Sequence, residues 1–370
     1  MQFKLDIQKQ HLNEKNGLAR RGVLHTAHGD VQTPVFMPVG TIAAMKAMYF
    51  DTLHKTGADI MLSNVYHLMI QDRFKIIEQL GGLHKFMNWQ KPILTDCGGF
   101  QAMSLSALNK INEDGVTFRC HLSGAKHHLT PEYSMEIQHK LDTDITMALD
   151  ECVRHPAKEK YVKNAMYRSL RWAERSKKAF VERPGYGIFG IVQGGADKEL
   201  RTESVKGLVD IGFDGYAIGG DLAINDGQEL MFSVLDYLTP MLPHDKPRYL
   251  MGVGKPGDIV GSVLRGVDMF DCVMPARSGR NGQAFTRDGT LNMRNSKYRS
   301  DDKPLDEKCK CTACTQHTKA YLHHLFKAKE ILGPMLLTEH NIMYYQDLMR
   351  GIRKAIEENR YNEFAEGFFE

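Results

Sequence analysis

The sequence predicts an α/β fold built on a (β/α)₈ barrel, and three observations support this class. Eight short apolar runs recur along the 370 residues, and helix-like stretches separate them. Strands that are apolar almost throughout are expected where both faces of a parallel sheet are buried, as they are in such a barrel. The segments outside these runs and helices have the sequence patterns of antiparallel strands or of a metal-binding insertion, which can be added to a barrel. The runs are residues 35–39, 59–62, 93–95, 145–149, 188–192, 216–218, 249–253 and 269–273.

The segments before and between the runs predict two antiparallel additions. Residues 1–32 alternate apolar and polar side chains and contain the hairpin signal Asn16-Gly17, so a small antiparallel cap is expected before the barrel core at 33–275. A second antiparallel excursion, at 116–129, is expected after the third run. Helices are expected at, among other places, residues 162–181, 198–211 and 227–238.

The chain after the eighth run departs from the barrel pattern. Residues 276–340 hold a cysteine cluster and are expected to form a zinc-binding subdomain inserted after the eighth strand. The remaining 341–370 are expected to return to the barrel, with a closing helix at about 341–358. The predicted architecture is therefore cap, barrel, inserted subdomain and closing helix.

The cysteine cluster has the spacing of a structural metal knuckle. Cys309, Cys311 and Cys314 stand close together, and three thiolates with one imidazole complete the closed tetrahedral shell of a structural zinc site. We expect His340, at the start of the later helix, to supply the fourth ligand. The spacing leaves three other histidines open as donors, namely His317, His323 and His324. A closed shell does no chemistry, so the active site is expected elsewhere.

The composition bounds the class and the location of the protein. Hydrophobic residues make up 42% and charged residues 25%, which is typical of a globular chain and unlike a disordered one. The N-terminus lacks the apolar run of a signal peptide, and no stretch approaches the roughly 20 apolar residues of a membrane span. Seven cysteines without a secretion signal predict a reducing, cytoplasmic location with no membrane partner.

The distribution of charge along the chain is more informative about binding partners than the net charge of +3. Residues 277–320 contain ten Lys/Arg and five Asp/Glu, a surplus of five, so the rest of the chain is near −2. A basic surface beside a metal knuckle is suited to a phosphate backbone. A solvated lysine-rich loop would have the same composition, so charge alone does not establish a nucleic-acid partner.

Polar residues stand where the predicted strands end, which is where a barrel carries its chemistry. Asp96 and Asp150 follow the third and fourth runs, and Asp271 lies inside the apolar eighth run, where a carboxylate costs free energy unless it is partnered or used. A single aspartate would most simply be a helix cap or one partner of a structural salt bridge. Three at equivalent strand ends indicate two-carboxylate chemistry at an anomeric carbon, in which one carboxylate attacks and another moves the proton.

Several motifs in order resemble one enzyme family over nearly the whole chain, the bacterial tRNA-guanine transglycosylases, also called queuine tRNA-ribosyltransferases. These enzymes exchange guanine at the anticodon wobble position of tRNA for a 7-deazaguanine. The resemblance implies a barrel with a zinc subdomain and a homodimer acting on a tRNA with a GUN anticodon. The motifs are TPVFMPVGT at 33–41, LTDCGGFQ at 94–101, IVQGG at 191–195, MFDCV at 269–273 and RSGRNG at 277–282, together with the cysteine cluster.

The resemblance also implies a role for individual residues. Asp271 is similar to the family's nucleophile, which attacks the ribose, and Asp96 to its general acid/base. Zinc ligation falls on the three cysteines and His340. The implied base-binding residues are Asp150, Gln193, Gly220, Phe100 and Met251. The implied anticodon-binding residues are Arg277 and Arg280. Phe100 and Met251 would sandwich the base between them.

The sequence also departs from the family pattern. An apparent one-residue insertion at Asp221 lies in the loop after the sixth run, which helps to recognise the substituent at position 7. Cys152 and Ile224 follow the bacterial pattern that takes 7-aminomethyl-7-deazaguanine, the precursor used in queuosine biosynthesis. Two other functions stay open, a non-catalytic RNA-binding or scaffolding paralogue and a barrel glycosidase, and the presence of both Asp96 and Asp271 argues against the paralogue.

Overall fold

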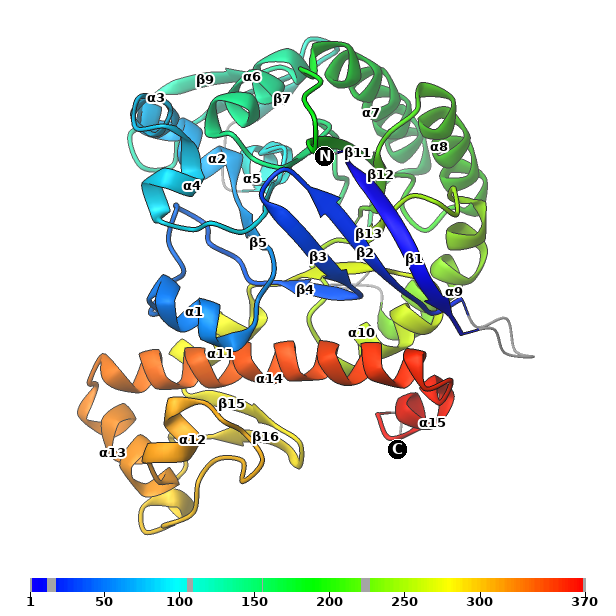
Figure 1. The fold of residues 1–370 in the computed structure, drawn as a ribbon. Coiled ribbons are helices and arrows are strands. Elements are labelled where there is room, and N and C mark those ends of the chain that lie inside the picture. The colour runs from blue at the N-terminus through cyan, green and yellow to red at the C-terminus, as the bar shows by residue number, and fades with distance from the viewer. Residues whose placement is uncertain (1, 12–17, 105–108, 155, 221–226, 369–370) are drawn as a thin grey trace.

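The eight predicted apolar runs form one closed parallel sheet in the structure, a computed structural model (Figure 1). It describes all residues except 1, 12–17, 105–108, 155, 221–226 and 369–370. The strand order is β4-β14-β13-β12-β11-β10-β6-β5, and a parallel bridge between Val39 and Leu62 closes the sheet. The predicted (β/α)₈ barrel is confirmed. The barrel strands are β4 Val35–Met37, β5 Met61–Ser63, β6 Ile93–Thr95, β10 Ile145–Met147, β11 Gly187–Val192, β12 Gly215–Ile218, β13 Arg248–Leu250 and β14 Met269–Asp271.

The barrel strands are apolar because both of their faces are covered. All six residues of β11 are buried, with its partners β10 and β12 in unbroken parallel register. Helices pack around the outside of the sheet (Figure 1). None of the helices in the described parts of the chain is both long and apolar enough to cross a membrane. The helices around the barrel are α1 Phe50–Thr56, α2 Val65–Met69, α3 Arg73–Gln79, α4 Gly82–Met87, α5 Gly99–Ser104, α6 Pro131–Leu141, α7 Glu159–Ala179, α8 Lys198–Ile211, α9 Gly227–Leu238 and α10 Pro256–Leu264, with 3-10 turns at Ile70–Asp72 and Thr239–Met241.

The expected N-terminal cap is a three-stranded antiparallel sheet of β1 Lys4–Gln10, β2 Arg20–Thr26 and β3 Gly29–Thr33. Its predicted Asn16-Gly17 turn lies outside the described residues. The cap is tied to the amino-terminal ends of the barrel strands by two buried carboxylates. Arg20 pairs with Asp268 at 2.6 Å, with both side chains excluded from solvent. The ring of His28 lies 2.9 Å from Asp144, which stands just before β10. The opposite, carboxyl end of the barrel is left for chemistry.

The second antiparallel excursion is also present. It contains β7 Asn109–Ile111, β8 Val116–Arg119 and β9 Lys126–Leu129, so it begins before the predicted residue 116. The extra strand pairs Asn109 with Phe118, and the buried Phe118 and Leu129 hold the excursion against the barrel core. Strand β7 was not predicted because its side chains are largely polar and do not form an apolar run.

A separate layer follows β14, as the sequence predicted (Figure 1). The short helix α11, Met274–Arg280, comes first and lies on the barrel side, and the layer itself contains β15 Gln283–Thr286, β16 Gly289–Asn292, a 3-10 turn at Ser296–Tyr298, α12 Thr312–Gln316 and α13 Lys319–Ala328. The long helix α14, Leu332–Glu357, lies between this layer and the barrel, and α15, Tyr361–Glu366, follows it. A small apolar core that includes Leu322, Leu325 and Leu337 supports the layer.

The closing helix begins earlier than expected. It starts at Leu332 and not at about residue 341, and it includes Gly333 and Pro334, two residue types that are unfavourable in a helix interior. Both stand in its first turn, where a missing backbone N–H costs little because that donor has no partner inside the helix. The helix therefore runs unbroken across the division at 340–341 that the sequence suggested between subdomain and closing helix. The domain limits 32, 275 and 340 stay predictions.

Candidate active site and metal centre

The three candidate aspartates stand at the carboxyl end of the barrel. Asp96 follows β6, Asp150 lies three residues beyond the end of β10, and Asp271 is the last residue of β14. Parallel strands bring their carboxyl ends to one rim, so residues far apart in the sequence meet there. The charge of Asp271 contributes to the shifted pKa of Asp96, which places the two carboxylates within electrostatic reach of each other.

Asp96 is buried and fully hydrogen-bonded. Its Oδ1 accepts the backbone N–H groups of Val65, at 2.8 Å, and Gly98, at 3.2 Å. Its Oδ2 accepts the side-chain amide of Asn64. Burial raises the pKa of Asp96 to about 6, although the three donors act to lower it. The charge of Asp271 raises the pKa of Asp96 as well. A carboxyl group with a pKa near neutrality can both donate and accept a proton under cellular conditions.

Asp271 has one oxygen held and one oxygen open. Its Oδ1 accepts the hydroxyl of Tyr249 at 2.6 Å and the backbone N–H of Gly252 at 2.8 Å. In the described part of the chain, no donor is hydrogen-bonded to its Oδ2. Burial raises the pKa of Asp271, and the Tyr249 and Gly252 donors oppose that rise. The side chain is thus oriented by two fixed donors while Oδ2 remains available to react.

A second polar pair lies beside these carboxylates. Oδ2 of Asp150 accepts the side-chain amide of Gln193 at 2.6 Å, and its Oδ1 accepts the thiol of Cys97 at 3.2 Å. Burial raises the pKa of Asp150, and the Gln193 and Cys97 hydrogen bonds act against it. A buried carboxylate next to an amide presents hydrogen-bond acceptors and a donor together. These groups are complementary to the donors and acceptors along the edge of a purine. The structure brings these two predicted residues into contact.

The other predicted base-binding residues surround this pair less closely. Phe100 lies on α5 and is 42% exposed to solvent. Met251 follows β13 and packs, half-buried, against the barrel core. Gly220 follows β12 and has a φ of 101°, a left-handed value that favours glycine. A sandwich of a base between Phe100 and Met251 stays a prediction.

Arg277 and Arg280 lie on α11, which begins three residues after Asp271. Arg277 is exposed and Arg280 is half-buried. Burial and the neighbouring charge of Arg277 lower the pKa of Arg280. Two cations on one short helix at the end of β14 place positive charge beside the aspartate rim. Such charge suits phosphate groups, and a contact with RNA stays a prediction.

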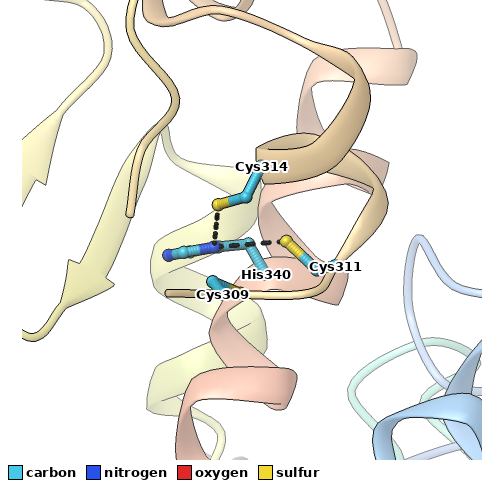
Figure 2. Close-up of side chains that lie close together, drawn as sticks. All are labelled: Cys309, Cys311, Cys314 and His340. Atoms are coloured by element: carbon cyan, nitrogen blue, oxygen red, sulfur yellow. Dashed lines mark hydrogen bonds between the residues drawn. The ribbon is translucent and has the colours of Figure 1, made fainter. Parts of the chain in front are cut away.

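Cys309, Cys311, Cys314 and His340 form one cluster that could hold a metal ion (Figure 2). Their ligand atoms all lie within 4.8 Å of one another. The sulfurs of Cys311 and Cys314 are 3.4 and 3.3 Å from Nδ1 of His340. Nε2 of His340 lies 2.8 Å from the carbonyl oxygen of Phe285, which can only accept, so Nε2 carries the hydrogen and Nδ1 is left as a ligand.

His340 is therefore the fourth member that the sequence favoured. It is the ninth residue of α14 and is completely buried, so the expectation that it begins a helix was wrong. The three other histidines stand outside the cluster. Nδ1 of His323 faces the carbonyl of Met293 at 2.7 Å, and His317 stacks on Tyr321, while His324 also faces that ring. Which of the four candidate histidines joins the cysteines is decided only by the position of the long helix in the folded protein.

A second group, His28, His84 and Asp144, has metal-ligating side chains but not the geometry of a metal site. The two imidazole rings are stacked 3.6 Å apart with only 17° between their planes. A bound ion must lie near the plane of each ring, about 2 Å from the nitrogen, and nearly parallel rings at this spacing share no such point. Both imidazoles instead contact the Asp144 carboxylate, at 2.9 and 3.1 Å, and these contacts tie the cap and α4 to the barrel.

Sequence reasoning missed two residues that control the aspartates. Asn64 and Tyr249 donate to Asp96 and Asp271. Tyr249 lies in an apolar strand and would ordinarily be assigned to the core. In the structure Tyr249 pairs with Met269, two residues before Asp271 on the neighbouring strand, and this register brings the phenol to the carboxylate. The predicted insertion at Asp221 and the predicted specificity residue Ile224 lie outside the described residues.

The family model described as queuine tRNA-ribosyltransferase matches residues 14–370. A protein of that name from Rickettsia prowazekii is 62% identical over 338 residues, covering 91% of this chain and 93% of the relative. A protein of the same name from Rickettsia typhi is 62% identical, covering 94% of this chain and 95% of the relative. Another from Granulibacter bethesdensis is 58% identical, covering 96% of this chain and 93% of the relative. The chain belongs to the queuine tRNA-ribosyltransferase family of enzymes.

Proposed function

We propose that the protein exchanges guanine at the wobble position of a GUN anticodon for a 7-deazaguanine, as a step of queuosine biosynthesis. The observation that carries the proposal is the state of Asp271, whose Oδ1 is held by Tyr249 and Gly252 while Oδ2 is open. Beside it lies Asp96, a second carboxyl group with a pKa of about 6. One carboxylate ready to attack and another ready to move a proton are the requirements of displacement at an anomeric carbon.

The reaction then has two matched steps. Oδ2 of Asp271 attacks C1′ of the ribose, and the bond from C1′ to the base nitrogen breaks. Asp96 gives its proton to the departing guanine, and a covalent ester joins Asp271 to the RNA. In the second step Asp96 removes a proton from the incoming base, whose nitrogen attacks C1′ and releases Asp271. The base is exchanged with no change in oxidation state, and each carboxyl group returns to its starting form.

Asp150 and Gln193 are suited to hold the base during this exchange. An ionised Asp150 accepts the adjacent N–H donors of a guanine edge, and the Gln193 amide already lies 2.6 Å from its carboxylate. The backbone N–H of Gly220 is the complementary donor for the 6-oxo group, and Phe100 and Met251 cover the faces of the ring. Cys152, half-buried two residues beyond Asp150, supports 7-aminomethyl-7-deazaguanine as the incoming base.

The RNA is proposed to enter across α11. A base that is to meet a buried carboxylate must leave its stack, and its flanking phosphates then need cations near the rim. Arg277 and Arg280 on α11 provide them at the end of the strand that carries Asp271. The basic surplus of residues 277–320 extends the same charge over the inserted subdomain.

The metal of the cysteine cluster is proposed to be zinc. Three thiolates and one imidazole are its usual structural shell, and ordinary zinc bond lengths in a tetrahedron place sulfur and nitrogen about 3.6 Å apart. The distances of 3.4 and 3.3 Å from the Cys311 and Cys314 sulfurs to His340 Nδ1 are close to this value. Bound zinc would offset the thiolate charge and fix the subdomain.

Two further features are proposed on the family resemblance. A homodimer is expected because members of this family commonly pair through the region of the zinc subdomain. A cytoplasmic location is expected because the substrate tRNA is found there and because the three thiolate ligands of the cluster require reduced cysteines. Both stay predictions about the protein in solution and in the cell.

Changing Asp271→Asn should abolish incorporation of labelled guanine into a tyrosine-type tRNA transcript and remove the covalent enzyme–RNA band on a denaturing gel. An amide is a poor nucleophile but has the same shape, so tRNA binding should remain within about twofold. Asp258→Asn, at a buried carboxylate on α10 that accepts Gln228, is the control and should stay active. An unchanged covalent band would reject Asp271 as the nucleophile, and tRNA binding without exchange by the wild type would favour the non-catalytic paralogue.

Changing Tyr249→Phe should move the acidic limb of the kcat/KM profile to higher pH. The phenol favours the ionised form of Asp271, so its loss raises the pKa of that carboxyl group further, and the nucleophile is protonated at a pH where the wild type is ionised. The expected shift is about one pH unit, the effect of one hydrogen bond to a charged group. Tyr361→Phe, which removes a buried hydroxyl bonded to the carbonyl of Val260, should leave the limb in place. A shift to lower pH would contradict this role.

Changing Arg277→Ala should weaken tRNA binding and reduce its dependence on salt. Loss of one phosphate contact lowers the slope of log Kd against log salt by about one unit. The slope is measured by filter binding at several salt concentrations. Arg360→Ala, at a surface arginine paired with Glu358, is the control and should keep the wild-type slope. The same slope in both variants would remove Arg277 from the RNA-binding surface.

Changing Cys311→Ser should remove the bound metal and lower the melting temperature. An ion present at one hundred times its Kd contributes about 2.7 kcal/mol to stability, so a loss of at least that order is expected. Metal per chain and thermal unfolding are the two measurements. Cys120→Ser, at a buried cysteine outside the cluster, should keep the metal. Full metal content in the Cys311 variant would refute the ligand assignment.

A further inference from the structure

Arg201 connects the two glycine-containing loops that border the proposed base site. It is the fourth residue of α8, and its side chain is completely buried. Its Nε donates to the carbonyl oxygen of Gly195 at 2.5 Å, in the loop after β11. Its Nη2 donates to the carbonyl oxygen of Gly219 at 2.9 Å, in the loop after β12. One rigid guanidinium thus spans the loop that carries Gln193 and the loop that carries Gly220.

Two glycines in these loops lie too close to their neighbours to accept a side chain. A Cβ added to Gly194 would lie 2.9 Å from the backbone nitrogen of Arg201, and one added to Gly219 would lie 2.7 Å from Nε2 of Gln193. The backbone N–H of Gln193 donates to Oγ of Ser204, one turn farther along α8, at 3.1 Å. Helix α8 therefore holds both the backbone of Gln193 and the carbonyl groups of its neighbours.

The hydrogen bond to Gly219 determines the direction of the next amide. In a planar trans peptide the C=O and N–H groups point in opposite directions. The carbonyl of Gly219 points toward Arg201 and α8, which lies on the outer side of the sheet. The N–H of Gly220 in the same peptide unit must then point away from α8, toward the barrel axis, where Gln193 and Asp150 are paired.

We infer that Arg201 is a positioning residue for base recognition, because it locks the Gly219–Gly220 peptide with its N–H toward the substrate. The inference rests on the proposed function and deepens it. The ligand it selects is a purine-like base with a ring carbonyl beside a ring N–H: the carbonyl accepts from Gly220, while the N–H groups donate to Asp150. Arginine suits this position because its planar fork holds two carbonyl groups in one fixed arrangement, whereas the single ammonium of lysine cannot.

The test is a steady-state exchange assay with labelled guanine at saturating tRNA, comparing Arg201→Lys with the wild type. The guanine KM should rise about tenfold and kcat at saturating guanine should change by less than about twofold, because ground-state recognition of the base is weakened. Arg248→Lys is the matched control. Arg248 is also buried and donates to two carbonyl groups, of Leu242 and Gly266, but at the opposite end of the barrel. Its guanine KM should stay at the wild-type value.

Each other result has a defined meaning. A wild-type guanine KM in folded Arg201→Lys, a fall in kcat alone, or equal KM increases in both variants would overturn the positioning role. Folding is judged by tRNA binding and metal content. If the lysine variant does not fold, Arg201→Gln, which keeps two N–H donors on a neutral side chain, is measured by the same criteria. Failure of the wild type to exchange guanine would instead reject the proposed function, and with it this assignment.

Discussion

One buried side chain, Asn341, connects the metal cluster to the candidate active site. Its amide donates to the carbonyl groups of Pro275 and Gln283, and its oxygen accepts the N–H of Phe285. Its neighbour on α14, His340, belongs to the metal cluster and donates to the carbonyl of Phe285. Because Pro275 lies in the first turn of α11, the short helix that follows Asp271, folding of the metal cluster and placement of that rim are mechanically linked. A structural ion can therefore affect activity without taking part in the reaction.

The two ends of the barrel use buried carboxylates in opposite ways. At the amino-terminal end, Asp268 is neutralised by Arg20, and Asp144 faces two histidines, so these charges are paired and inert. At the carboxyl end, Asp96 and Asp271 are held by neutral donors, and burial raises the pKa of both. Neutral donors orient a carboxylate without cancelling its charge. This difference separates the end with structural pairs from the end that carries the candidate active site.

The fold and the identities of the main polar residues could be predicted because they depend on local patterns. Apolar runs of strand length predicted all eight barrel strands, and three closely spaced cysteines predicted the metal cluster. The extra strand β7 was missed because its residues are largely polar, and the start of α14 was misplaced because Gly333 and Pro334 are tolerated in a first helical turn. In both places tertiary packing decided what local preference did not.

The sequence by itself determined which chemical groups are present and predicted that strand ends would collect them, because eight apolar runs alternating with helices favour a barrel whose strands end at one rim. Only the tertiary structure decided how they are used. It selected His340 from four histidines, joined Tyr249 to Asp271, and buried Arg201 between two loops. These contacts join residues that are distant in the chain, and their free energy depends on burial and on the direction of individual donors, which no local pattern of residues records.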